Sequence, residues 1–427
     1  MNGLRINGTS LNGLRVNGTS LNGLRVNGAS LNGLRINGAS LSGVNLVGGE
    51  LRGVAPDGSP IGGASFAGVE AQALLSDAST LTLRIDGARS SGDLWLYEVS
   101  YPTASGPKPL CGLDAAGAPI EAIALAGRWN LAEGVPGGGS WIDDPAMFTF
   151  GCRDAALAKC VELGYKPWAS AGGISLRSHH QACTRLIRAD YCGNGQPGTL
   201  DGWQINLYDA LGIQADTESG AAWVFEGKWG PAGAVCVDEY RLLELVASGP
   251  VPDCALAKLT GTCAAGGFAG GVLLQSEYNS AGLIELVRDI VNGSPDAKLA
   301  DKVEDALAEL EGAFAELAES PPDRLAAVGK LEDAVGDLKA TINAGTLPPG
   351  YGNGLANRIT GVARFQATAT IDANACGAKK PSELTKAKLL RAEGDKRRST
   401  GDYKGACGKY KGAIDKAEDA LGSPCPP

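Results

Sequence analysis

The sequence predicts a multidomain protein of β and α structure, with an N-terminal right-handed β-solenoid, a disulfide-braced, β-rich α+β middle domain and a C-terminal α-helical bundle. Three observations predict this order: glycine recurs every five residues at the start, eight cysteines gather in the middle, and apolar residues take helical spacing towards the end. The expected domains are residues 1–70, 71–270, 275–375 and 376–427.

The N-terminal repeat places glycine at every fifth position from Gly3 to Gly68, with an apolar residue two positions before each glycine except at Pro56. A period of five fits neither an α-helix nor a half-buried strand, so it is typical of a repeat protein. Units such as residues 29–33, Ala-Ser-Leu-Asn-Gly, resemble those of the pentapeptide-repeat family. In that family four units form one square coil of a right-handed β-helix, and the resemblance implies such coils over residues 1–70.

A ten-residue repeat offers a second interpretation of the same segment. The position two before the central apolar residue alternates between leucine and threonine or alanine, so the longer repeat is ten residues. A flat, two-sided coil of that length would stack four arginines in one column about 4.8 Å apart, an unfavourable ladder of like charges. They are Arg5, Arg15, Arg25 and Arg35. The square coil divides them between two columns, and we prefer it for that reason.

The solenoid interpretation makes two structural predictions. Leu11, Leu21 and Leu31 should point inward in stacked coils. The first rung, near Met1, has no cap in this sequence, and the open end of a solenoid is an adhesive edge. We therefore expect either an upstream cap or self-association of chains through the N-terminal solenoid.

Cysteine usage indicates the compartment. Eight cysteines fall in the middle of the chain, at Cys111, Cys152, Cys160, Cys183, Cys192, Cys236, Cys254 and Cys263. An even set predicts a framework of four disulfides, whose pairing stays open. A zinc site is disfavoured because the chain has two histidines and these cysteines lack the CxxC spacing. Disulfides are typical of exported proteins, so we expect a secreted or cell-surface protein whose signal peptide was removed or is encoded upstream of Met1.

Between the repeats and the C-terminal helices, the pattern predicts short strands and one helix. Residues 81–85, 94–99 and 148–150 carry β-branched and aromatic residues between turn clusters, which is typical of strands. A helix is expected at Asp154–Leu163, where apolar residues share one side and Gly164 ends the pattern.

Amphipathic helices dominate the C-terminal region. Apolar residues recur at helical spacing from Leu299 to Leu317 and again from Leu325 to Ile342. Residues 381–421 resemble a single tetratricopeptide-like hairpin, a unit that must pack on something else. The last three cysteines form an odd set, so one is expected to be a free buried thiol or to pair between chains: Cys376, Cys407 and Cys425.

The densest group of polar residues is Ser178–Gly193, which holds both histidines of the chain, two cysteines, two arginines and an aspartate. It includes the tetrapeptide Ala-Asp-Tyr-Cys at residues 189–192. This tetrapeptide and its surroundings resemble the ADYC domain of secreted bacterial proteins, particularly those of myxobacteria, over roughly residues 75–265. The resemblance implies an exported protein, but it implies no established activity.

A thiol enzyme is one interpretation of the segment between His179 and Cys192. Cys183 would be the nucleophile, His180 its base and Asp190 the supporting acid, since a cysteine, a histidine and a nearby acid are the minimum for such catalysis. The substrate would be a polymer of the cell envelope. If Cys183 were in a disulfide, it would have no nucleophilic thiol.

A structural interpretation explains the same residues, and we favour it. Both histidines would satisfy buried carbonyl groups near a disulfide, while Arg185 and Arg188 would pair with Asp190 or Asp201. The sequence Asp201-Gly202 itself is typical of a turn.

The sequence therefore favours an exported bacterial structural or interaction protein without catalytic activity, with itself or a cell-surface glycan as partner. The alternatives are an envelope-polymer enzyme and a glycan-binding module that uses Trp168, Trp203 and Trp229 as stacking platforms. A net charge of −9 disfavours nucleic-acid binding. No run reaches the roughly 18–20 apolar residues of a membrane span, and no pattern indicates a cofactor or a bound metal.

Overall fold

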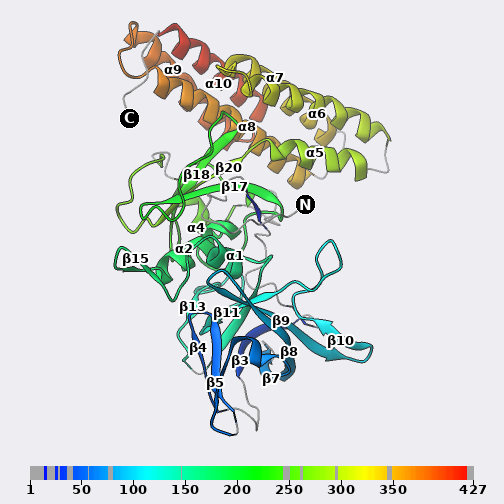
Figure 1. The fold of residues 1–427 in the computed structure, drawn as a ribbon. Helices are drawn as coiled ribbons and strands as arrows, with labels where there is room; N and C mark the ends of the chain where they lie inside the picture. Colours follow the sequence, from blue (N-terminus) through cyan, green and yellow to red (C-terminus); the bar gives the residue numbers. More distant parts are fainter. Residues whose placement is uncertain are drawn as a thin grey trace. The chain divides into compact units, whose positions relative to one another are not determined.

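The computed structural model describes residues 14–16, 25–26, 29–35, 42–55, 57–75, 80–145, 147–243, 251–259, 263–293, 297–343 and 349–420. The chain divides into two compact units (Figure 1). The first unit comprises residues 1–217, 226–238 and 252–276, and the second comprises residues 218–225, 239–251 and 277–427. The polypeptide therefore passes between the two units several times.

An antiparallel ring of strands forms the first part of the first unit. Its strands are β3 (Ala29–Arg35), β7 (Glu70–Leu75), β8 (Thr80–Ser91), β9 (Leu94–Thr103), β11 (Ala122–Ala126) and β14 (Phe148–Cys152). The order β9-β11-β14-β3-β7-β8 returns to β9, because β8 pairs with β9 as well as with β7. The ring is thus a closed barrel, and β10 (Gly106–Pro109) extends β9 as a hairpin.

Buried apolar side chains, which alternate with exposed polar ones along the strands, fill the interior of this barrel. On β8, Leu83 and Ile85 are buried while Arg84 and Asp86 are exposed, as expected for a strand with one face towards a core. Aromatic side chains occupy the rest of the core. The cluster that contains Leu83 and Ile85 also contains Phe66, Tyr97, Phe148 and Phe150.

A glycine turn shapes the segment that follows the first repeats. Strands β4 (Ser42–Val47) and β5 (Glu50–Val54) form a hairpin, and β6 (Pro60–Gly62) pairs with β5. The two-residue loop is Gly48-Gly49, with φ of +58° and +82°, the left-handed backbone that a tight hairpin of this type needs. The amide of Leu51 donates a 2.7 Å hydrogen bond to the Tyr97 hydroxyl, which anchors the hairpin to the barrel.

Short elements complete the first unit together with most of a second sheet, while the first residues of β18 and the last residues of β20 belong to the second unit. The short elements are α1 (Ala156–Glu162), α2 (Arg177–Arg188), α4 (Asp253–Leu256), the 3-10 helix η1 (Gly63–Phe66) and the strand pairs β12 (Arg128–Trp129) with β13 (Trp141–Ile142) and β15 (Ser170–Ala171) with β16 (Ile174–Ser175). The second sheet has the order β1-β17-β20-β18-β19, with β1 (Leu14–Val16), β17 (Trp203–Asp209), β20 (Leu274–Asn279), β18 (Trp223–Gly230) and β19 (Gly233–Val237).

The eight middle cysteines are all paired within the chain. The bridges are Cys111–Cys152, Cys160–Cys183, Cys192–Cys254 and Cys236–Cys263. The prediction of disulfide bonds is therefore confirmed. Of the last three cysteines, Cys376 is also disulfide-bonded, Cys407 is a buried free thiol, and Cys425 lies outside the described residues.

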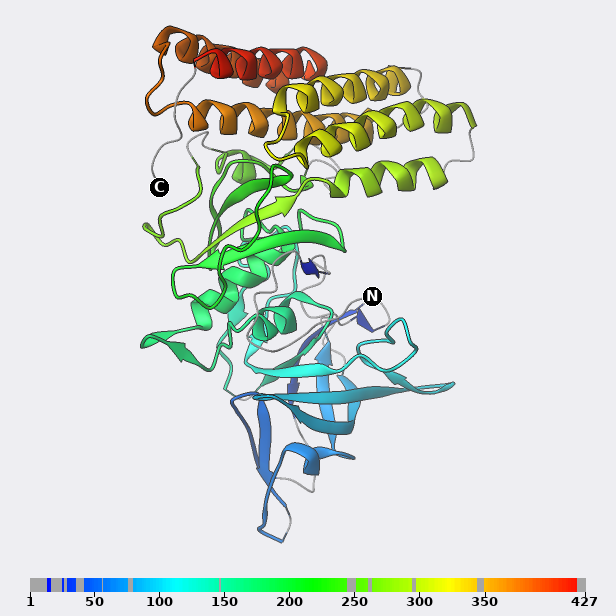
Figure 2. The same cartoon turned by 45° about the horizontal axis from the view of Figure 1, so that its top comes forward.

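Helices build the second unit and lie side by side in Figure 2. They are α5 (Gly282–Gly293), α6 (Ala297–Leu317), α7 (Arg324–Asn343), α8 (Pro349–Ala373), α9 (Pro381–Ser399) and α10 (Tyr403–Asp419). Their buried faces are apolar, as Leu310, Leu331 and Ile414 illustrate. Glu239 belongs to this unit and is buried there among arginines of α8 and α9.

The predicted fold class is wrong at the N-terminus, because the described residues form no solenoid. Stacked coils would pair in parallel, whereas β1, β3 and β4 pair antiparallel and belong to three different sheets. The physical reason is visible at Gly48-Gly49: a glycine period can make tight hairpin turns as readily as the corners of a coil.

The specific predictions from the solenoid fall in several places. Leu11, Leu21 and the first rung near Met1 lie outside the described residues, while Leu31 lies in β3 and pairs with Leu75 of β7. Both repeat interpretations, the square coil and the flat ten-residue coil, fail for the same reason, since each requires parallel stacking.

Candidate functional site

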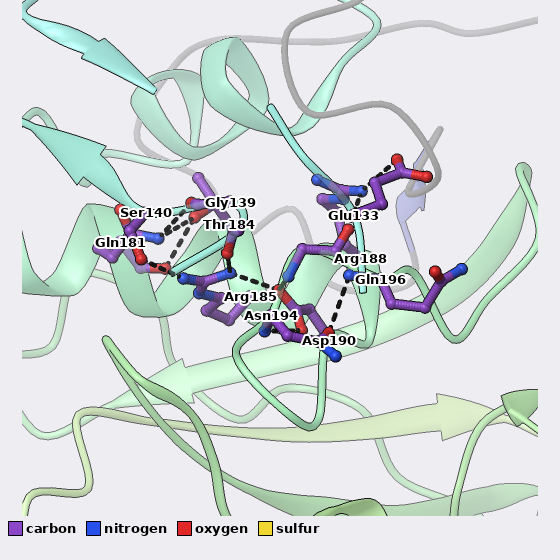
Figure 3. Close-up of polar contacts among 12 residues, drawn as sticks. Glu133, Gly139, Ser140, Gln181, Thr184, Arg185, Arg188, Asp190, Asn194 and Gln196 are labelled. Atoms are coloured by element: carbon purple, nitrogen blue, oxygen red, sulfur yellow. Dashed lines mark hydrogen bonds and ion pairs between the residues drawn. The ribbon is translucent and has the colours of Figure 1, made fainter. Parts of the chain in front are cut away.

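Asp190 is the centre of the polar cluster that the sequence singled out (Figure 3). Helix α2 ends when Ala189 takes a left-handed conformation, with φ of +51°, and this turn directs the chain away at Asp190. The Asp190 carboxylate accepts hydrogen bonds from the amides of Asn194, at 3.0 Å, and Gly195, at 2.8 Å. Arg185 Nη1 donates to the same carboxylate. Asp190 is therefore buried with its charge fully engaged.

Arg185 connects this carboxylate to a distant loop. Its guanidinium donates to Gly138 O at 2.6 Å, to Ser140 Oγ at 2.8 Å and to Pro231 O at 3.3 Å. The side chain is only 2% exposed, so each of these bonds replaces a bond to water. A buried ion pair is tolerated when its remaining hydrogen-bonding capacity is satisfied in this way.

Two more α2 side chains hold the same loops. Arg188 Nη2 donates to Gly195 O at 2.7 Å and to Glu133 at 3.1 Å, while Gln181 Nε2 donates to Gly139 O at 3.0 Å. The Gly138 position admits no side chain, because a Cβ there would lie 2.1 Å from Asn194 O. One face of α2 thus fastens the loops at residues 133–141 and 193–195.

The histidines occupy the same helix but are sealed off from solvent. His180 Nε2 lies 3.0 Å from Leu157 O, and burial lowers the pKa of His180 to about 4. His179 stacks on the Tyr165 ring at 6.3 Å between centroids, and burial lowers its pKa as well. Among the described residues, His179 Nδ1 has no hydrogen-bond partner. Both imidazoles are therefore held neutral at pH 7.

The structure separates the three residues that a thiol enzyme would need. Cys183 is bonded to Cys160, so it has no thiol to act as a nucleophile. His180 is bonded to a carbonyl of α1, and Asp190 is bonded to Arg185 and two amides. All three lie on or next to α2, but each is bonded to a different partner.

Each residue of the tetrapeptide at 189–192 has a separate structural role. Ala189 ends α2, Asp190 bonds the following loop, and Cys192 is bridged to Cys254. The Tyr191 hydroxyl donates to Glu226 Oε1 at 2.7 Å, and its ring stacks on Trp229 with centroids 5.3 Å apart. The motif therefore fixes a chain reversal between a helix and the second sheet.

Sequence reasoning missed a second set of buried carboxylates. Glu226 accepts from Tyr191 and from Ser276 Oγ, at 2.8 Å, and is fully buried. Asp209 accepts from Tyr165 Oη at 2.6 Å and from the amide of Gln214 at 2.8 Å. Glu226 follows an apolar stretch of β18 and carries no recognisable spacing to its partners, so no sequence signal could have found it.

The tryptophans proposed as glycan platforms are not open aromatic faces. Trp229 is fully buried and donates through Nε1 to Ser276 Oγ at 2.8 Å, and Trp203 is 7% exposed. Trp168 is half-buried and packs against the apolar cluster around α1. In the part of the chain that the structure describes, no three potential ligands gather as a metal site would require. No helix among the described residues is long and apolar enough to cross a membrane.

Comparison with known proteins gives one match. No curated protein and no solved structure matches the chain. The match is to a protein family, the ADYC domain, over residues 63–243. This span contains α2, the tetrapeptide and strands β17, β18 and β19 of the second sheet, and the family prediction is confirmed there. Residues 63–243 of this chain are thus similar to the ADYC domain, whose four naming residues act here as structural braces.

Proposed function

We propose that the protein is exported and acts at the bacterial surface or outside the cell as a structural or interaction protein without catalytic activity. The observation that carries the proposal is the engagement of the polar cluster on α2. Arg185, Asp190 and Arg188 are all buried, and their hydrogen bonds join α2 to backbone atoms of the neighbouring loops.

Export is supported by the four bridges of the first unit. Disulfides persist in oxidising compartments, while the cytosol keeps thiols reduced. Each bridge ties segments that are 23 to 62 residues apart, so together they restrict the unfolded chain strongly. Such a framework suits a protein that must stay folded without chaperones outside the cell.

The absence of reactive groups on α2 supports a role in contact rather than chemistry. A general base must reach its substrate and hold a pKa near the working pH. The pKa of His180 is about 4, and its Nε2 faces a backbone carbonyl inside the unit. The rigid loops that α2 fastens, at residues 133–141 and 193–195, are instead suited to presenting a fixed surface to a partner.

Cell fractionation combined with thiol mapping tests the export proposal. We expect an epitope-tagged chain in the medium or in the protease-accessible surface fraction, with its eight middle cysteines resistant to alkylation before reduction. Recovery from the cytosol with those thiols open to alkylation would overturn the proposal.

A polymer-degradation assay separates the proposal from the enzyme alternative. Purified protein is incubated with isolated envelope polymer, and soluble fragments are quantified for the wild type, His180→Gln and Asp190→Asn. We expect no release above a heat-treated control. Release that falls with His180→Gln, in a variant whose circular dichroism matches the wild type, would favour the enzyme.

A further inference from the structure

One short sequence recurs four times near the N-terminus. Leucine, arginine and then isoleucine or valine, followed by Asn-Gly, occupy residues 4–8, 14–18, 24–28 and 34–38. Residues of the second, third and fourth copies lie in strands, namely β1 (Leu14–Val16), β2 (Arg25–Val26) and β3 (Ala29–Arg35). The copies are nearly identical in sequence, so their backbones have nearly the same preferences.

These equivalent strands pair with different partners. Strand β1 pairs antiparallel with β17, with Leu14 opposite Ile205, Arg15 opposite Gln204 and Val16 opposite Trp203. Strand β2 pairs with β3, and β3 lies between β14 and β7 in the barrel. All of these pairings lie within the first unit. One sequence therefore serves three separate strand positions.

The physics of strand pairing makes these positions interchangeable. A ladder is formed by backbone hydrogen bonds, which do not depend on side-chain identity. The copies also share the same alternation of side chains, so the pattern that sets register does not distinguish one copy from another. Among the described strands, β1 is the terminal strand of its sheet, and this three-residue strand is the neighbour of β17 on that side.

We propose that this edge of β17 is a docking site for the Leu-Arg-Ile/Val strand of a second copy of the chain. A copy from a neighbouring molecule presents the same backbone and side chains as the resident β1, so the two compete on equal terms except for tethering. The tethered strand wins in dilute solution, because its effective concentration is higher. Crowding of chains, as on a surface, favours exchange between molecules. The inference rests on the proposed contact function and names its partner.

Engineered disulfides test first whether the copies are interchangeable. The Arg15–Gln204 pair is directly opposed, and opposed residues in antiparallel strands lie about 4.5–5.5 Å apart, within the range of a disulfide. We expect Arg15→Cys/Gln204→Cys and Arg5→Cys/Gln204→Cys to form internal bridges, mapped by mass spectrometry. Linkage of Arg15→Cys alone would show a unique register and overturn the interchangeability.

Mixing two single variants then tests exchange between molecules. Isotope-labelled Arg15→Cys protein and unlabelled Gln204→Cys protein are oxidised together over a range of concentrations. We expect a cross-link between the two chains that rises with concentration, exceeds that of the exposed Ser170→Cys control several-fold, and falls when an excess of the synthetic peptide of residues 12–18 is added.

The outcomes distinguish the possible failures. In one outcome the double variant forms its internal bridge, but the mixed single variants do not cross-link above the control. This would show that β1 pairs with β17 without exchanging between molecules, and it would overturn the proposal. Failure of the Arg15→Cys/Gln204→Cys link in a variant with native circular dichroism shows that β1 does not occupy the edge, which also overturns it. Neither outcome bears on export, which fractionation and thiol mapping decide.

Discussion

Two carboxylates are buried to the same extent in this protein, and they are stabilised in different ways. Asp190 and Glu239 are each 1% exposed. Asp190 is held by residues close to it in sequence: Arg185 and the amides of Asn194 and Gly195. Glu239, in the second unit, is held by arginines that are 119 to 159 positions away.

The contacts given below for the Glu239 carboxylate are all with positively charged arginines. Arg398 forms two bonds to it, of 2.7 and 2.9 Å, Arg364 forms one of 3.1 Å, and Arg358 lies 3.6 Å away. Burial alone would raise the pKa of Glu239, but these arginines lower it to about 2. At Asp190 a neutral side chain could still accept an amide bond and would lose the charge that faces one arginine. At Glu239 it would lose the charge that faces three arginines. Neutralising Glu239 should therefore lower the free energy of unfolding more than neutralising Asp190 does.

The largest expected effect is at Glu239. Glu239→Gln removes the negative charge that buried Arg358 and Arg364 and the partly buried Arg398 share, although Arg364 keeps its bond to Asp395. The change should cost about 3–5 kcal/mol of unfolding free energy. Urea unfolding followed by circular dichroism measures it. Glu393→Gln is the matched control, because Glu393 bonds Lys409 at an exposed site and should barely move the midpoint. A similar small shift for both variants would contradict the role given to Glu239.

The Cys160–Cys183 bridge is expected to matter nearly as much to the Asp190 region. It joins α1 to α2, the helix that carries Arg185 and leads to Asp190. Replacing both cysteines with alanine should cost roughly 2–5 kcal/mol. Thermal unfolding measures the loss, and peptide mapping must show the other three bridges intact. An unchanged melting temperature would mean that the loop network holds α2 unaided.

As pH falls, His180 and Glu239 should each lower the stability of the protein, but over different ranges of pH. The folded pKa of His180 is about 4 against an ordinary 6.5, so the unfolded chain protonates first as pH falls. Stability from neutral His180 is complete above pH 6.5 and declines between 6.5 and 4, by roughly 3 kcal/mol. Stability from Glu239, with a pKa lowered from 4.5 to about 2, is complete above pH 4.5 and is lost below it.

Urea unfolding of the wild type and His180→Gln at several pH values tests this separation. The variant should lose much of the decline between pH 6.5 and 4, leaving the part due to His179, whose pKa is also lowered. Its behaviour below pH 4 should follow the wild type. An identical pH profile for both proteins would show that His180 is not held neutral by burial.

The smallest expected effect is at Asp190 itself. Asp190→Asn retains an oxygen that can accept an amide bond but leaves the buried Arg185 without its counter-charge. Because Arg185 keeps its bonds to Gly138 O, Ser140 Oγ and Pro231 O, the cost should be lower than at Glu239, about 1–3 kcal/mol. Asp57→Asn is a suitable control, because Asp57 is exposed and bonds only the nearby Ser59. A loss at Asp190 as large as that at Glu239 would erase the distinction between the two sites.

The distance along the chain between interacting residues explains which interactions the sequence could predict. The sequence predicts that Arg185 and Arg188 pair with Asp190 or Asp201, because these charges lie close together along the chain, and the structure pairs Arg185 with Asp190. The even number of cysteines likewise predicts the disulfides. Glu239 could not be found, because its partners lie more than a hundred residues away and follow no motif.

The error at the N-terminus has a different physical origin. A period of five states where the chain can turn, but it does not state which strand lies beside which. Antiparallel partners for β1 and β3 come from residues 203–205 and 72–75, which lie outside the repeat. Periodicity within a segment cannot reveal partners that the rest of the fold supplies.

The buried thiol of Cys407 allows local opening of the helical unit to be measured by alkylation. It lies on α10, has no exposed surface, contacts Thr360 of α8, and burial raises its pKa to about 12. An alkylating reagent reacts with thiolate that it can reach, so it will label this residue only in molecules where α10 has detached. The rate of labelling in native buffer therefore reports local opening of these helices without any change to the sequence.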